Sequence, residues 1–166
     1  VQHYLHDPAD PRSLATASVR AILEDRDGLL WVGTSEGLDC LDRRTGAFTH
    51  FRHAADDPTS LSDDAIWTLF EDNQGLLWVG TETGGLNRFD PATQTFSRYQ
   101  HDADDPASLS HDRVRAILES ETGRLWIGTQ NGLDWLDRER EAVVHYQHSP
   151  YDPYSLSSSS VWSIYE

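Results

Sequence analysis

The sequence predicts an all-β protein built from repeated units of four short antiparallel strands. The first observation is a motif, LWVGT or LWIGT, that recurs at 30–34, 77–81 and 125–129. Its tryptophans are separated by 47 residues (31 to 78) and then by 48 (78 to 126), and a fixed period of this length is typical of repeat architectures. The second observation is that each unit contains several short β-branched and aromatic segments, separated by glycine turns. The third is that these segments are apolar on consecutive positions, which indicates strands covered on both faces.

Each unit is expected to hold its four strands in the same order. The turn after the first strand ends in glycine, which supplies the positive φ that a tight hairpin needs. The tryptophan motif follows as the second strand. The first strand is predicted at 18–24, 65–71, 113–119 and 160–166, the third at 38–42, 86–90 and 133–137, and the fourth at 48–53, 96–101 and 143–148.

Four-stranded units covered on both faces are typical of β-propeller blades packed face to face. A helical solenoid is excluded because no unit offers a helix-length window with 3.6-residue periodicity. We therefore expect a single partial β-propeller over 1–166, an open arc of a larger propeller, since typically four to eight blades close the ring. Its predicted parts are an outer strand of a preceding blade at 1–6, blade 1 at 18–53, blade 2 at 65–101, blade 3 at 113–148, and an inner strand of a following blade at 160–166.

A second motif, His-x-x-x-Asp-Pro-x-Ser-Leu, links each unit to the next. Its histidines occur once per unit, so they cannot converge on one metal ion, and we expect them to anchor the loop between blades. The aspartates before proline are expected to cap the same loop, because they are equivalent, whereas catalytic carboxylates form a pair in different environments. The histidines are His6, His53, His101 and His148, and the aspartates are Asp10, Asp57, Asp105 and Asp152.

The composition excludes several classes of partner. The chain carries 28 acidic and 13 basic residues, a net charge of −15, so it lacks the basic surface that nucleic-acid binding requires. It has no apolar run of about 18 residues, so direct membrane insertion of this segment is not expected, and its first residues do not resemble a signal peptide. The lone Cys40 can form no intrachain disulfide. Asp25 and Asp27 before Gly28 offer too few oxygens for calcium and are expected to form an Asx turn, so neither a metal nor a cofactor is predicted.

The recurring anchors G-x-LWVGT, GL-x-x-x-D, F-x-x-[YF]-x-H and D-P-x-SL resemble the two-component regulator propeller repeat, over essentially the whole chain. The resemblance implies an extracytoplasmic or periplasmic sensor domain of a membrane-anchored bacterial signalling protein. Its output module would be a histidine kinase, a hybrid kinase or a diguanylate cyclase, and its ligand is often a glycan fragment. None of these output parts is in the chain, so we expect the segment itself to bind a small molecule or oligosaccharide and not to be an enzyme.

A ligand site is expected where the units differ, at one position of the first strand. This position holds arginine and tryptophan alternately, which could bind an acidic group by bidentate hydrogen bonds and a sugar face by stacking. The opposing interpretation is that the arginines contact loop aspartates and the tryptophans pack between blades. The predicted ligand-binding residues are Arg20, Trp67, Arg115 and Trp162. The turns at 35–36, 82–83 and 130–131 also vary and are secondary candidates.

Two other functions stay open on the sequence alone. A propeller-type lyase or hydrolase would need a unique acid–base pair, for which His111 and Asp112 are the weak candidate, and no residue is assigned a catalytic role. A purely structural propeller would mediate dimer contact without a ligand. In either case the open flanks of the arc predict self-association, and Trp31, Trp78 and Trp126 are expected to be mostly buried between blades.

Overall fold

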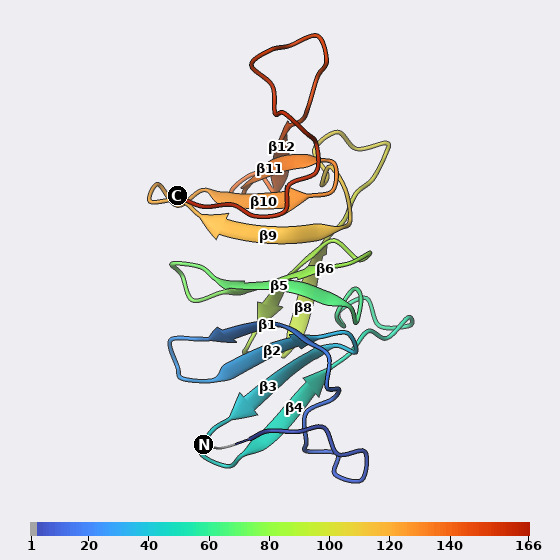
Figure 1. Cartoon of the computed structure of the whole chain (residues 1–166), viewed down its shortest axis with the longest axis vertical. Coiled ribbons are helices and arrows are strands. Elements are labelled where there is room, and N and C mark those ends of the chain that lie inside the picture. Colours follow the sequence, from blue (N-terminus) through green and yellow to red (C-terminus); the bar gives the residue numbers. More distant parts are fainter. Residues whose placement is uncertain (1–2) are drawn as a thin grey trace.

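The computed structural model of the chain describes residues 3–166 and confirms the all-β prediction. In this part of the chain there are twelve strands and no helix, and the strands form three four-stranded antiparallel sheets (Figure 1). Each sheet is a meander in which strands adjacent in sequence pair with each other. The first sheet contains β1 (Val19–Glu24), β2 (Leu30–Thr34), β3 (Leu38–Asp42) and β4 (Ala47–Phe51). The second contains β5 (Ile66–Glu71), β6 (Leu77–Thr81), β7 (Leu86–Asp90) and β8 (Thr95–Tyr99), and the third contains β9 (Val114–Glu119), β10 (Leu125–Thr129), β11 (Gly132–Asp137) and β12 (Ala142–Tyr146).

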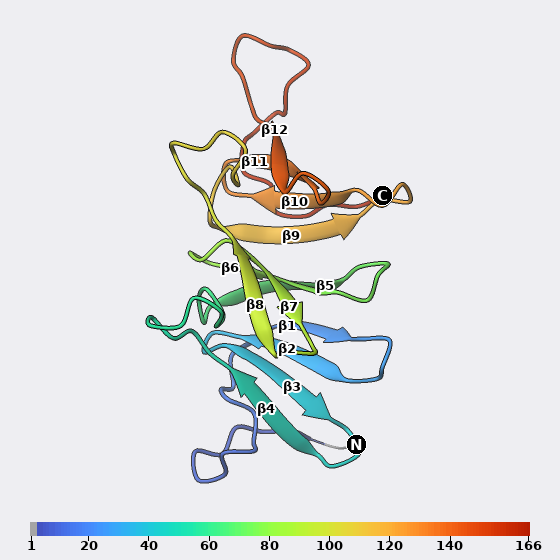
Figure 2. The same cartoon turned by 180° about the vertical axis from the view of Figure 1, so that it is seen from behind.

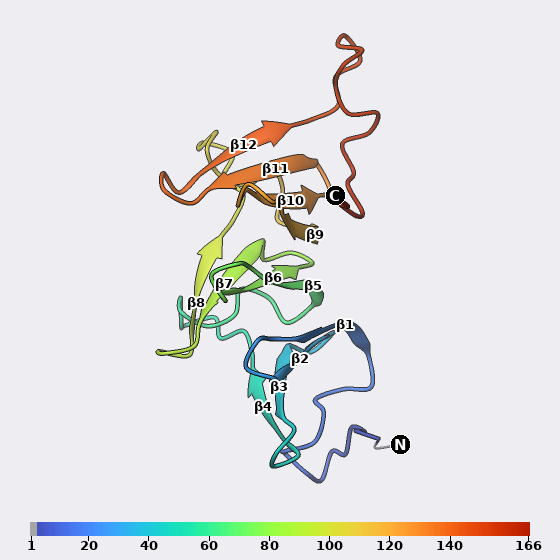
Figure 3. The ribbon, with the colours of Figure 1, turned by 90° about the vertical axis from the view of Figure 1, so that its left-hand side faces the viewer.

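The sheets are stacked one after another along the long axis of the molecule (Figures 1 and 2). The first strands lie side by side, β1 beside β5 and β5 beside β9. In Figure 3 these inner strands gather on one side, and the sheets fan outward from them toward β4, β8 and β12. The arrangement is that of three successive propeller blades around a common axis, and the arc formed by residues 3–166 is not closed. We call the interface between the first two sheets the first seam and that between the last two the second seam.

Most predicted strands are present, but the fourth strand of each blade is shorter than predicted. It ends two residues early, at Phe51, Tyr99 and Tyr146. The chain leaves the sheet there because its backbone bonds to the following loop instead. In the first blade the His53 N–H donates to Asp64 Oδ1 at 2.7 Å.

The strands predicted at the two ends of the chain are not formed. Residues 1–2 lie outside the described part, and neither 3–6 nor 160–166 is a strand here. Each was expected to be the lone strand of a further blade, so its assignment to that blade stays a prediction. A strand needs a hydrogen-bonded neighbour in its own sheet, and an adjacent blade supplies only face-to-face packing. The C-terminal segment still lies against the third blade, where the Val161 N–H donates to the Thr129 carbonyl at 2.9 Å.

The repeated tryptophans pack in the seams, as predicted for two of the three. Trp31 and Trp78 are 5% and 0% exposed. Trp31 meets Phe89 of the next blade with ring centroids 5.2 Å apart, and its indole N–H donates to Asp25 Oδ2 at 2.7 Å. Trp126 is only partly buried, because no further sheet covers it within residues 3–166, so its predicted burial was too high.

The glycine of the tryptophan motif allows neighbouring blades to approach closely. A Cβ atom at Gly80 would lie 2.5 Å from Thr68 Cγ2 in its own sheet and 2.7 Å from Val114 Cγ1 of the next blade. A Cβ atom at Gly33 would lie 2.6 Å from Ile66 Cγ2, again on the next blade. Any side chain at these positions would push the blades apart, because protein interiors are packed without spare volume.

Each seam is also closed by a hydrogen bond between a turn and a glutamate. The donor is a backbone N–H in the first turn of one blade, and the acceptor is the glutamate that ends the next inner strand. The bonds run from Arg26 to Glu71 Oε2 (3.1 Å), from Asn73 to Glu119 Oε2 (2.6 Å), and from Glu121 to Glu166 Oε2 (3.2 Å). The last pair shows that the C-terminal segment continues the same pattern without being a strand.

The repeated histidines anchor the loops between blades, as predicted. In every copy the ring Nδ1 lies within hydrogen-bonding distance of the carbonyl of the leucine that ends the motif. The pairs are His6–Leu14 and His53–Leu61 at 2.8 Å, and His101–Leu109 and His148–Leu156 at 2.7 Å. The aspartates before proline accept the N–H two residues ahead, which is the capping role expected for Asp10, Asp57, Asp105 and Asp152.

Candidate functional site

The four predicted ligand-binding residues occupy one repeated structural position, and three of them lie at a β-bulge. In β1, Val19 pairs with Thr34 and Ala21 with Gly33, so Arg20 is the extra, unpaired residue. Trp67 in β5 and Arg115 in β9 stand at the same irregularity. A bulge changes the direction of a side chain, and bulges are common beside functional sites. In each blade three residues of the inner strand therefore face the glycine–threonine pair of the second strand.

The first arginine stacks on the tryptophan of the next blade. Arg20 Cζ lies 4.9 Å from the centre of the Trp67 ring. Glu82, in the turn after β6, accepts a hydrogen bond from Trp67 Nε1 at 2.8 Å and lies 3.4 Å from Arg20 Nη1. The carboxylate therefore offsets the charge of Arg20 and fixes the indole.

The second arginine makes the same kind of pair with the C-terminal segment. Arg115 Cζ lies 3.7 Å from the centre of the Trp162 ring, and its Nη1 donates to Ser160 Oγ at 2.7 Å. Trp162 is 65% exposed, so one part of this stack faces solvent. Arg115 has no carboxylate partner within residues 3–166, and its Nε is buried without a hydrogen-bond partner.

Two further residues belong to this position: Arg113, which was not among the predicted site residues, and Glu82, which lies in one of the turns named as secondary candidates. Arg113, at the entry to β9, makes an ion pair with Glu82 (Nη2 to Oε1, 3.0 Å) and donates to Gln130 Oε1 at 2.7 Å. Glu82 therefore meets three donors, from Arg20, Trp67 and Arg113. This turn position holds serine, glutamate or glutamine in the three units, and that variation is the signal that made the turn a secondary candidate.

The arrangement offers guanidinium groups and indole rings in alternation along neighbouring inner strands. The structure brings Arg20 to Trp67 and Arg115 to Trp162, and Glu82 holds the first pair. The arginines contact tryptophans and a glutamate, not the loop aspartates that the opposing interpretation named. Such surfaces can bind planar acidic groups through the guanidinium and sugar faces through the indole. In the second pair the positive charge of Arg115 has no carboxylate partner among the described residues, whereas in the first pair Arg20 has Glu82.

The other chemical candidates of the sequence serve the fold. Asp25 Oδ1 accepts the N–H of Asp27 at 3.0 Å, which confirms the predicted Asx turn. In residues 3–166 no group of three or more His, Cys, Asp or Glu side chains is arranged to hold a metal. His111 Nδ1 accepts a hydrogen bond from the backbone N–H of Arg113, and Asp112 accepts one from the backbone N–H of His101. The two side chains therefore bind different backbone groups and not each other. Burial, ahead of nearby charges, lowers the pKa of His111.

Comparisons with known proteins identify the repeat. The model of the two-component regulator propeller family matches residues 13–36, 60–83 and 108–131. The fold is similar to the extracellular domain of BT3049 from B. thetaiotaomicron, a protein assigned as a hybrid two-component system, with 29% identity and a TM-score of 0.79. The match covers 90% of this chain and 20% of that one, so the chain spans about a fifth of the relative's length. No curated protein matches the sequence.

More distant structures share the fold alone. The extracellular domain of BT4673 from B. thetaiotaomicron, also a hybrid two-component system by its description, is 22% identical with a TM-score of 0.75, over 95% of this chain and 20% of that one. A virginiamycin B lyase from Staphylococcus aureus is 15% identical with a TM-score of 0.60, over 79% of this chain and 41% of the lyase. Among residues 3–166 there is no helix long and apolar enough to cross a membrane.

Proposed function

This chain carries three two-component regulator propeller repeats, and from them we infer that it is the ligand-sensing segment of a bacterial two-component sensor. The sensor would be anchored in a membrane, and this segment would lie in the periplasm or outside the cell. The likeness to an extracellular domain of a hybrid two-component system supports that location. A histidine kinase or diguanylate cyclase output would belong to another part of such a protein.

The proposed ligand is an acidic or polyhydroxylated small molecule, with an acidic oligosaccharide as the first candidate. The observation that carries the proposal is the repeated bulge, which presents Arg20, Trp67 and Arg115 from equivalent positions of adjacent inner strands. A bidentate contact between arginine and a carboxylate contributes about 1.5–3 kcal/mol, and stacking on an indole contributes about 1 kcal/mol. The chain is strongly acidic, so arginines at this place are local exceptions to its charge.

Arg115 is the stronger anchor of the two arginines. Its guanidinium has no acidic partner among the described residues, whereas Arg20 shares Glu82 with Arg113. A carboxylated ligand that reached Arg115 would also meet the exposed face of Trp162. We therefore expect an Arg115→Ala change to weaken binding more than an Arg20→Ala change.

The test is a calorimetric screen of acidic and neutral oligosaccharides against the intact propeller and its variants. Arg20→Ala combined with Arg115→Ala should lower the affinity for an acidic ligand by at least about tenfold. Arg12→Ala combined with Arg44→Ala is the matched control, since it removes the same charge from arginine side chains that are 76% and 88% exposed. If a ligand binds all of these proteins equally well, the arginine–tryptophan pairs are structural and the proposed site is wrong.

A further inference from the structure

The first seam contains a cavity where the second seam contains arginine side chains. The repeat places Cys40 and Pro91 at the positions that Arg88 and Arg138 occupy one unit later. Arg88 is the cross-strand partner of Trp78, as Cys40 is of Trp31, and Arg138 lies over the Trp78 ring, so both arginines face the second seam. The first seam therefore lacks two long cationic side chains, and a cavity of about 240 Å³ is found there.

The second seam shows how this space is used when it is filled. Arg138 Cζ lies 5.6 Å from the centre of the Trp78 ring. Its Nη1 is 3.2 Å from Asp72 Oδ2, and its Nη2 is 3.0 Å from Glu119 Oε1. Asp72 Oδ2 accepts the indole N–H of Trp78 at the same time. The seam thus holds a guanidinium between an aromatic face and two carboxylates.

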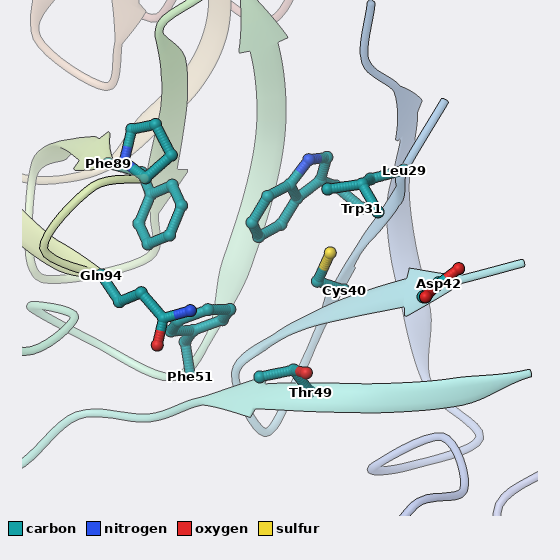
Figure 4. A pocket seen from close by; sticks show the side chains of 9 residues that line it. Leu29, Trp31, Cys40, Asp42, Thr49, Phe51, Phe89 and Gln94 are labelled. Carbon is teal, nitrogen blue, oxygen red and sulfur yellow. The ribbon is translucent and has the colours of Figure 1, made fainter. Parts of the chain in front are cut away.

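The cavity of the first seam is also lined by aromatic rings, as the second seam is. Figure 4 shows the rings of Trp31, Phe51 and Phe89 on one side of the Cys40 sulfur, with Asp42 at the other end. Neighbouring rings lie at centroid distances of 5.1–5.8 Å. The lining is mostly apolar, and the volume exceeds the roughly 150 Å³ of an engineered cavity that admits benzene.

The first seam also contains carboxylates, and one of them, Asp25, has no cationic partner in the described part of the chain. Asp25 Oδ2 accepts the Trp31 indole N–H, as Asp72 does for Trp78, but no cation pairs with it among residues 3–166. Asp42 lines the cavity and meets only the exposed Arg44, at 3.4 Å. Glu71, the equivalent of Glu119, is already paired with Arg26 at 3.7 Å.

The chemistry of Cys40 supports a negative potential inside the cavity. Burial raises the pKa of its thiol to about 11, and the charges of Asp25 and Asp42 act in the same direction. Both carboxylates therefore act on the Cys40 sulfur. A cation placed beside the rings would experience the same field.

We propose that the cavity of the first seam binds a small organic cation, a guanidinium or alkylammonium group on a short apolar chain. The cation takes the place that Arg138 takes in the second seam, over Trp31 and toward Asp25. Aromatic rings with a carboxylate bind such cations because the π-faces are negative and the charge is partly desolvated. The site lies at the turn end of the blades, away from the Arg20 bulge, so it does not depend on the proposed sensing function.

The direct test uses propylguanidinium, which reproduces the arginine side chain, and propylurea, which has the same shape without the charge. Cys40 is the only cysteine, so its alkylation by iodoacetamide, followed by intact mass, reports occupancy of this cavity alone. We expect propylguanidinium to slow alkylation, and propylurea to act at least about tenfold more weakly, because propylurea lacks the charge on which a cation–π contact depends. Equal protection by both compounds, or none by propylguanidinium, would overturn the proposal.

Variants place the effect in the cavity. Pro91→Arg should fill it from within and reduce the propylguanidinium effect at least about tenfold, while Pro91→Ala, its matched control, should leave it within about twofold. Asp42→Asn should weaken the effect several-fold and Arg44→Ala should not. Urea unfolding of each variant verifies that it is folded, and Pro91→Arg has a folded precedent in Arg138. Unchanged protection in a folded Pro91→Arg protein would show that the cation binds elsewhere.

Discussion

Replacing Gly80 by alanine tests whether close approach of the blades holds the structure together. The added Cβ would lie 2.5 Å from Thr68 Cγ2, 2.7 Å from Val114 Cγ1 and 3.1 Å from the Val114 carbonyl oxygen. Ordinary carbon contacts are about 3.5–4.0 Å, so the overlap is about an ångström on two sides. Overpacking of this kind costs about 1–3 kcal/mol, and we expect the upper end because one obstacle is backbone.

The assay is urea unfolding followed by tryptophan fluorescence, with Gly28→Ala as the control. Gly28 has a φ of +79°, and a Cβ added there would meet no atom within 4 Å, so its substitution carries only the backbone cost of about 1–2 kcal/mol. Thr68→Ser removes the methyl group that a Cβ at Gly80 would strike, and it should recover about 1 kcal/mol in Gly80→Ala but nothing in Gly28→Ala. A Gly80→Ala protein no less stable than Gly28→Ala, or without coupling to Thr68→Ser, would refute the steric argument.

Three further predictions concern charge, the thiol and assembly. Arg138→Met should lower the free energy of unfolding by about 3 kcal/mol, because it leaves the buried Asp72 carboxylate without its cation, and urea midpoints measure this. Alkylation of Cys40 should stay slow below pH 9 and rise toward pH 11. The same raised pKa makes stability fall between these values, since the unfolded thiol, with a pKa of 9.0, loses its proton first. We also propose that the chain self-associates through its open flanks, where Ile22 is 65% and Tyr146 44% exposed, and light scattering that finds a dilution-resistant monomer would contradict this.

The repeat made the blades predictable because each anchor is a local requirement. Glycine at the hairpin turns and the Asx turn at Asp25 depend on neighbours within a few residues, so their roles could be inferred from the chain alone. The histidine loops were predictable because four equivalent copies exclude a single metal site. The conformation of the two chain ends was not predictable, because whether 160–166 forms a strand depends on a pairing partner and not on its own residues.

The candidate site was predictable in its residues but not in its contacts. Alternation of arginine and tryptophan at one position was visible in the sequence, whereas the bulge that presents them arises from the register of two strands. The role of Glu82 depends on three side chains from three different strands or turns. The cavity at Cys40 follows from comparing two seams in space, because neither Cys40 nor Pro91 signals it alone.

The hydrogen bond that closes each seam has a consequence for how the protein unfolds. Because the turn of one blade always donates to the glutamate of the next, at Glu71, Glu119 and Glu166, every coupling involves nearest neighbours only. Stability in such an array is approximately a sum of unit and interface terms, so cooperativity is only as strong as its weakest interface. The first seam contains the cavity, so we expect it to be the interface at which the blades separate first. A ligand that filled this cavity would strengthen the interface, and the three blades would then unfold in a single cooperative transition.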